Sequence, residues 1–173
     1  MALIRLNSQS APANTFGGGK ILQVVENEET TTASWTGWGE VISQSITPSS
    51  TSSKILVLFN GVLGPSQRYH AGKLYRDTTQ IALGDANGNR TRVWFTLGHN
   101  QDATNQVYNS DYASAHYLDS PSTTSAVTYK VEMGSMYVTN LTSYRNRGTG
   151  DGNYNYFPCG TTSLTLIEID GSS

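Results

Sequence analysis

The 173-residue sequence has few cysteines to cross-link it and little net charge to create a strong electrostatic field. Its single cysteine excludes an intramolecular disulfide, and lysine and glutamate, two residues typical of surface helices, number only four and six. The formal net charge is −2, and no run of Lys or Arg is present to attract a phosphate backbone. These absences argue against a helical protein and against nucleic-acid binding.

Long apolar runs are also missing. The most apolar run, 55–59 with Val62 and Leu63 nearby, is far shorter than the roughly 20 residues of a membrane-spanning helix. The sequence begins Met-Ala-Leu-Ile-Arg-Leu-Asn-Ser, which lacks the apolar core of a signal peptide. We therefore expect no membrane partner, and synthesis in a reducing cytosol, which also suits a lone cysteine.

Motifs for catalysis and metal binding are equally scarce. Cys159 lies in no recognisable active-site context, so we predict a half-buried packing thiol. Two Asp-x-Asn-x-Asn segments, starting at Asp85 and Asp151, lack the later Gly and Glu of a calcium loop and are interpreted as turns. The histidines His70, His99 and His116 show no metal-ligand spacing. We expect no enzyme activity, no metal and no cofactor.

The residues that are abundant favour strands and turns. Serine and threonine number 20 and 21, and glycine and asparagine 17 and 13. Alternation and turn signals predict about nine strands, at 20–26, 38–46, 54–63, 67–76, 79–83, 93–97, 112–119, 127–133 and 163–169. The strand 54–63 is apolar on both faces, which is typical of a central strand. The fold class predicted is all-β, an antiparallel two-sheet β-sandwich of Greek-key or jelly-roll type.

The first 18 residues differ from the domain predicted at 19–173. They hold Pro12, part of the glycine triplet 17–19 and few large apolar side chains, so they have no means of folding alone. We predict an extended N-terminal arm that docks on another molecule. Its expected docking residues are Leu3, Ile4, Arg5, Leu6 and Phe16.

The segment 139–162 is predicted to be a long loop, and the stretch 137–157 is rich in tyrosine, arginine and asparagine. Flat aromatic faces beside planar hydrogen-bonding groups suit a sugar or a protein partner. The alternative is that the tyrosines cap one end of the sandwich. The candidate binding residues are Tyr144, Arg145, Arg147, Asp151, Asn153, Tyr154 and Tyr156.

Five strings taken together are similar to small virion proteins of tailed phages, especially phages of cyanobacteria, and to the distal domains of their tail fibres and tailspikes. The strings are GGGKILQVV, ITPSSTSSKILVL, LYRDTTQIALGDANGNR, YLDSPSTTSAVTYKVEM and SLTLIEI, within residues 17–169. This resemblance implies a β-sandwich that forms a homotrimer on the particle exterior and has no catalytic residues.

Fibre domains follow a shaft and an attachment region, whereas only the short arm precedes this domain. This departure leads us to expect a capsid decoration (cement) protein, made in the host cytoplasm and placed on the outer capsid surface. Its partners would be its own copies and the major capsid protein, with weak binding of host-surface glycans as a further expectation. The alternative is a tail-fibre or tailspike tip that recognises host polysaccharide through the tyrosine-rich loop.

Overall fold

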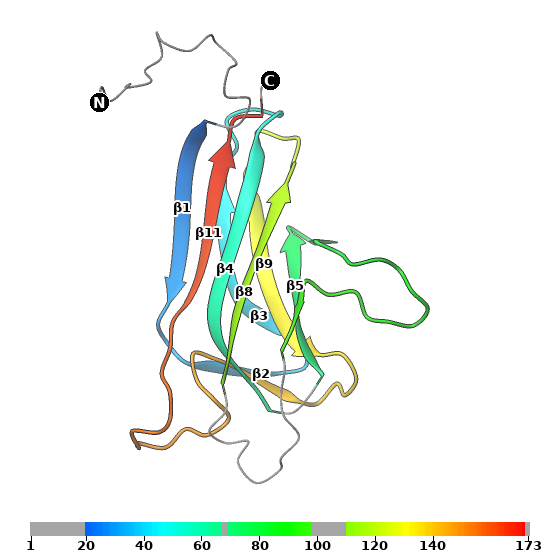
Figure 1. Ribbon diagram of the computed structural model, residues 1–173. Coiled ribbons are helices and arrows are strands. Elements are labelled where there is room, and N and C mark those ends of the chain that lie inside the picture. Colours follow the sequence, from blue (N-terminus) through cyan, green and yellow to red (C-terminus); the bar gives the residue numbers. More distant parts are fainter. Residues whose placement is uncertain (1–19, 67–68, 98–109, 172–173) are drawn as a thin grey trace, which may run out of the picture.

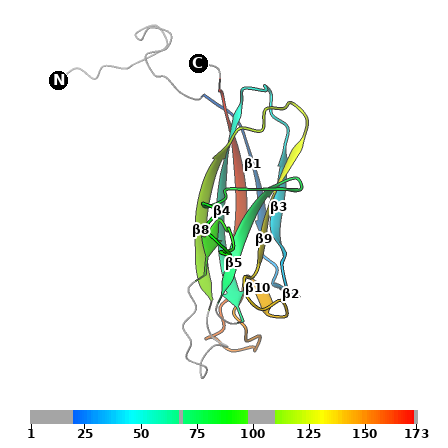
Figure 2. The ribbon, with the colours of Figure 1, turned by 90° about the vertical axis from the view of Figure 1, so that its right-hand side faces the viewer.

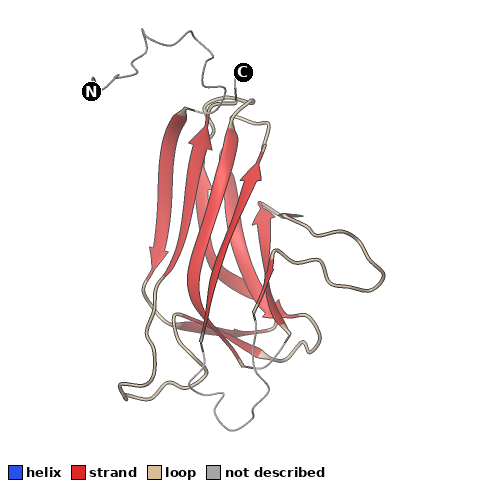
Figure 3. Ribbon diagram, in the orientation of Figure 1, coloured by secondary structure: helices blue, strands red, loops and turns tan. Residues whose placement is uncertain are grey.

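The computed structural model describes residues 20–66, 69–97 and 110–171 (Figure 1). The predicted arm and its docking residues therefore lie outside the described part. All regular structure in the described residues is β-strand (Figure 3). The strands are β1 (Ile21–Glu29), β2 (Ala33–Thr36), β3 (Gly39–Ile46), β4 (Lys54–Pro65), β5 (His70–Arg76), β6 (Thr79–Ile81), β7 (Phe95–Thr96), β8 (Asp111–Asp119), β9 (Val127–Ser135), β10 (Thr142–Arg145) and β11 (Thr162–Ile169).

The strands form two antiparallel sheets that pack face to face, which confirms the predicted sandwich (Figures 1 and 2). Sheet A has the order β1-β11-β4-β10-β2, with β8 on the other side of β4, and sheet B has the order β3-β9-β5-β6, with β7 also on β5. Without the short β2, β6 and β10, the orders are β1-β11-β4-β8 and β3-β9-β5-β7. This is the strand order of a jelly roll, the more specific of the two predicted topologies.

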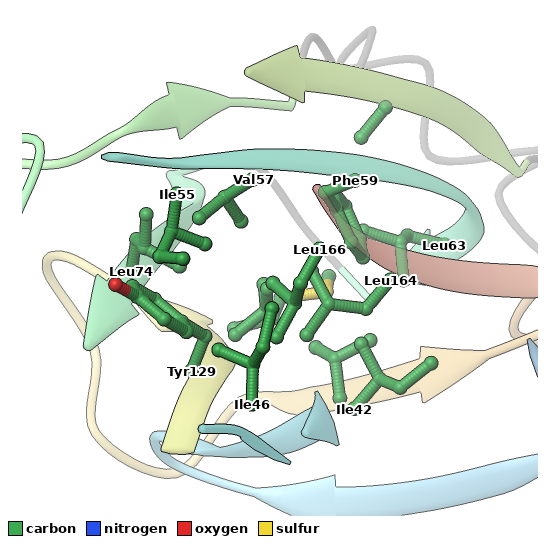
Figure 4. Packing of buried hydrophobic residues seen from close by; sticks show 14 of the residues in the cluster. Ile42, Ile46, Ile55, Val57, Phe59, Leu63, Leu74, Tyr129, Leu164 and Leu166 are labelled. Atoms are coloured by element: carbon green, nitrogen blue, oxygen red, sulfur yellow. The ribbon is translucent and has the colours of Figure 1, made fainter. Parts of the chain in front are cut away.

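The core lies between the sheets and comes from alternate positions of the long strands. Side chains from sheet A meet those of sheet B in one layer, with Phe59 and Tyr129 among the largest that are fully buried (Figure 4). The strand β4 is central, as predicted, because β11 and β10 pair with one of its edges and β8 with the other. The consecutive predicted strands 67–76 and 79–83 form a hairpin as β5 and β6, with Asp77 at a φ of 53° in its turn.

Two strands were missed by the prediction. Each has only four residues, and they pair with each other, Ser143 opposite Trp35, at the end of sheet A away from the start of β1 (Figure 1). The strand β10 falls within 139–162, which was wrongly predicted to be loop throughout. Such short strands show little periodicity of their own, and the contact of β10 with the end of β4 sets their place.

The expected face of β3 is interrupted by a β-bulge between Glu40 and Ile42. The bulge adds one residue, so Val41 and Ile42 are both buried while Glu40 is exposed. Regular alternation over the predicted strand 38–46 would place Glu40 and Ile42 on one face, whereas the bulge places them on opposite faces. A bulge of this kind changes the alternation locally and leaves no mark in an apolar pattern.

A charged cluster joins the two sheets at the end of β8. The carboxylate of Asp119 on sheet A accepts hydrogen bonds from the Arg76 guanidinium of sheet B at 2.9 and 3.1 Å. It also accepts one from the Tyr129 hydroxyl at 2.6 Å. Burial, then the neighbouring Asp119, raises the pKa of Tyr129, so this hydroxyl stays protonated. The cluster is satisfied internally and serves to hold the sheets together.

Candidate functional sites

The tyrosine-rich loop lies at the end of the sandwich opposite the start of β1 and the end of β11 (Figure 1). It follows β10 and returns to β11, and Arg147 and Cys159 pair through their backbones at its base. Cys159 is exposed, so the prediction of a half-buried thiol is wrong. It lies on the limb of the loop that leads into β11, paired with Arg147.

Three aromatic residues form a cluster at the tip of this loop. The rings of Tyr154 and Tyr156 are stacked, with centroids 5.2 Å apart and an interplanar angle of 4°, and Phe157 is tilted against both. Tyr154 and Tyr156 are 63% and 53% exposed. A Cβ on Gly152 would lie 2.7 Å from the Phe157 ring and 2.9 Å from the Tyr154 ring, so a larger residue there would displace these rings. The loop therefore presents a pre-arranged aromatic surface instead of burying its tyrosines.

Three further predicted binding residues are in contact with one another. The Arg147 guanidinium lies 4.5 Å from the centroid of the Tyr144 ring and 3.7 Å from the Asp151 carboxylate. Asp151 has a largely exposed side chain, and Asn153 is also exposed. The structure thus brings Tyr144, Arg147 and Asp151 into one polar and aromatic group.

Arg145 has a structural role instead. Its guanidinium donates to the Val41 carbonyl at 2.7 Å and to the Glu29 carboxylate at 3.1 Å, next to the connection of β1 and β2. The next residue, Asn146, donates to the carbonyls of Glu29 and Thr31 and takes a φ of 62°. Sequence reasoning missed Asn146, because a left-handed asparagine is recognised only once the backbone is known. These two residues anchor the loop.

The outer face of sheet A is a second candidate. Val24, Ile167, Leu56 and Leu118 are direct cross-strand partners on β1, β11, β4 and β8, so their side chains share the outer face. We call these four residues the apolar row. Val24 and Leu118, at its two ends, are 54% and 49% exposed.

The rows on either side of the apolar row differ from each other. Toward the start of β1, the partners are Ile21, Ile169 and Lys54. In the other direction, Glu26, Thr165, Leu58 and His116 lie in register, followed by Glu28, Ser163, Asn60 and Ser114. The outer face of sheet A therefore changes from apolar to polar along the strands.

The outer face of sheet B is polar and covers its own aromatic rings. Lys130 and Glu132 on β9 form an ion pair of 2.7 Å. The Lys73 ammonium lies 3.7 Å from the Trp38 ring, and Lys130 lies 5.1 Å from the Tyr75 ring. These cation–π contacts satisfy the rings within the chain.

The remaining candidates are weak. No group of three or more His, Cys, Asp or Glu residues in the described ranges is placed to hold a metal ion. His70 is buried in β5, His116 is exposed on β8, and His99 lies outside the described residues. A shallow depression beside β8 is lined by the loop after β6, Trp94 and the segment 114–117. No helix among the described residues is long and apolar enough to cross a membrane.

No family model matches the sequence, and no curated protein matches it. Among solved structures, similarity is found to T=1 particles derived from infectious bursal virus, with a TM-score of 0.43 and 11% identity over 100% of this chain. Similarity is also found to the VP2 subviral particle of infectious bursal disease virus (TM-score 0.41, 10% identity, 98% of this chain) and to the Gt strain of that virus (0.38, 10%, 98%). This chain spans 41%, 45% and 44% of those chains. Similarity at this level carries no conclusion about function.

Proposed function

We propose that this protein is a structural component of a tailed-phage virion, a decoration (cement) protein that forms a trimer on the outer capsid surface and reinforces contacts between major capsid subunits. The observation that carries the proposal is the sequence resemblance over residues 17–169. Its strings fall on one sandwich: they include the first parts of β1 and β4, the end of β5 with β6, parts of β8 and β9 with their connection, and nearly all of β11. A jelly roll alone does not determine the function, since the same fold occurs in viral capsid and lectin domains.

The direction of the strands supports different roles for the two ends of the sandwich, one for capsid binding and one for exposure to the exterior. The strand β1, which the predicted arm precedes in the sequence, starts at the end away from the aromatic loop (Figure 1). In this proposal, the arm grips the capsid, with Leu3, Ile4 and Leu6 inserted between subunits, and the loop faces outward. Three arms on one axis would turn weak contacts into strong binding through multivalency.

Deletion of residues 2–16 tests the arm. We expect this variant to lose binding to expanded capsids in a co-sedimentation assay, while its circular dichroism spectrum and its number of copies per oligomer match those of the full chain. A control in which Ser8 and Ser10 are changed to Ala keeps the length of the arm and its apolar residues and should still bind. Full binding by the deletion variant would contradict the proposal.

A second candidate function is favoured by the stacked pair of Tyr154 and Tyr156. Parallel exposed rings beside Asp151 and Asn153 suit the apolar face and hydroxyl edge of a sugar ring. In this alternative the protein recognises host polysaccharide, at a fibre or tailspike tip or as a second role of a decoration protein. A glycan array compares the wild type with Y154A/Y156A and with the control Y137A, which removes another exposed tyrosine. No binding by the wild type would remove this candidate.

A further inference from the structure

We infer that copies of this chain associate through the outer face of sheet A, with the apolar row at the centre of the interface. This inference deepens the proposed function, on which it rests for the number of copies, by naming the surface that joins them. Its partner is a second copy of the same chain.

The first argument is the pattern of β4. A strand that alternates between a core and water is apolar on one face only, whereas β4 carries Leu56, Leu58 and Val62 on its outer face in addition to its buried residues. The outer face of sheet A has no third layer of strand or helix in the described ranges. The composition of this strand therefore fits a face that becomes covered after folding.

The second argument is the register. Four strands set the side chains of the apolar row beside one another, so the row is continuous across the sheet. At a strand spacing of about 4.8 Å it extends roughly 14 Å. Ile21 and Leu22, 58% and 39% exposed, extend it at the β1 edge. Contiguous exposed apolar patches of this kind mark interaction sites.

The third argument is size. The face is four strands wide and about eight residues long, which with side chains corresponds to an area on the order of 700 Å². A standard stable interface buries about 800 Å² on each partner. Interfaces usually combine an apolar core with polar margins, and here the polar margin lies on one side of the apolar row, in the rows that contain Glu26, Glu28 and Ser114.

The fourth argument is self-complementarity. When copies are related by an axis parallel to the strands, β1 of one copy faces β8 of the next. Val24 then faces Leu118, and the Glu26 carboxylate faces the His116 imidazole, a hydrogen-bonding partner. The same axis places the starts of all β1 strands at one end of the assembly. Both two-fold and three-fold assemblies satisfy this arrangement.

The test is the solution mass of the full chain by sedimentation equilibrium at increasing protein concentration. The wild type is expected to form a discrete oligomer. In V24E/L118E, association should weaken by roughly a hundredfold or more, because carboxylates would be buried opposite each other. Since both positions are half exposed, the thermal unfolding of the isolated monomer should change little. The control S45E/Y137E adds the same two charges away from the face and should keep the wild-type mass.

Two outcomes overturn the inference: a wild type that is monomeric throughout, or a V24E/L118E variant that keeps the wild-type oligomer. If the charged variant fails to fold, V24S/L118S takes its place, and an unchanged association constant counts against the inference in the same way. Capsid co-sedimentation separates the two proposals. A wild-type oligomer that depends on this face but does not bind expanded capsids contradicts the decoration role and leaves the inference standing.

Discussion

The outer faces of the two sheets are built from similar strands but differ in whether their apolar side chains are covered by other residues of the chain. On sheet B, lysines lie over Trp38 and Tyr75, and an ion pair occupies the middle of β9. On sheet A, four strands align aliphatic side chains in one row. A face that covers its own rings needs no partner, whereas a face with a continuous aliphatic row gains from one. The four predictions below test this difference.

The largest effect should come from the inner side of β11. Leu166 is fully buried between the sheets, next in sequence to Ile167 of the apolar row. We expect L166A to lower the free energy of unfolding by about 4 kcal/mol, since it removes core contacts and leaves a cavity. Urea titration of the monomeric V24E/L118E background gives this value without a contribution from association. A loss no larger than that of the neighbouring I167A would contradict the assigned orientation of β11.

The second effect concerns Glu168, which is buried and points inward at the end of β11. Burial alone would raise its pKa, but the Ser53 hydroxyl beside it and hydrogen bonds from Ser49 and Gln23 lower the pKa to about 2. The pKa of Glu168 is about 4.5 in the unfolded chain and lower in the folded one. The ionised carboxylate therefore stabilises the fold, and this stabilisation is fully present above about pH 4.5. This contribution, about 3 kcal/mol, is lost as the pH falls from about 4.5 to 2.

Acid titration of stability measures this contribution. The wild type should lose stability steeply between pH 4.5 and 2, and E168Q should be less stable at neutral pH with a flatter profile in that interval. The control D85N changes an exposed carboxylate in the loop after β6 and should follow the wild type. If the wild type and E168Q lose stability equally between pH 4.5 and 2, the Glu168 carboxylate does not stabilise the fold.

A smaller effect separates the two outer faces directly. If copies associate through sheet A, the melting temperature of the wild type should rise with protein concentration. At ten times the dissociation constant the gain in stability is about 1.4 kcal/mol. V24S should reduce this dependence, and T128S on the outer face of sheet B should not. Equal concentration dependence in all three proteins would remove the distinction between the faces.

The smallest effect belongs to sheet B. A hydrogen bond from Lys130 to Glu132 raises the pKa of this lysine, so E132Q should lower it, as measured by NMR. Since both side chains are partly exposed, we expect E132Q to lower the free energy of unfolding by less than about 1 kcal/mol. The solution mass should not change. If E132Q dissociates the oligomer, the interface lies on sheet B and the assignment to sheet A is wrong.

The sequence was sufficient for the fold class and for the central place of β4, because alternation and a two-sided apolar run are local signals. The bulge at Val41 and the strands β2 and β10 were not predictable, since contacts between distant segments define them. Of the predicted binding residues, Tyr154 and Tyr156 do form an exposed stacked pair, whereas Arg145 is used to anchor the loop. The arm residues lie outside the described ranges and stay a prediction.

The apolar row illustrates the same limit. Val24, Leu56, Leu118 and Ile167 come from four segments spread over most of the chain, and each is an ordinary strand residue in its own segment. Only the order β1-β11-β4-β8 and the register bring them together. Strand order depends on the whole topology and could not be read from the sequence, so the surface it creates could not be read either.

The most direct measurement is a cryo-EM map of the purified virion with icosahedral averaging, at a resolution that distinguishes the two sheets. Our account predicts density for this domain repeated over the capsid at local three-fold positions, with the outer face of sheet A turned toward the shared axis and sheet B toward solvent. Density confined to the tail vertex, or single copies whose sheet A faces solvent, would contradict it.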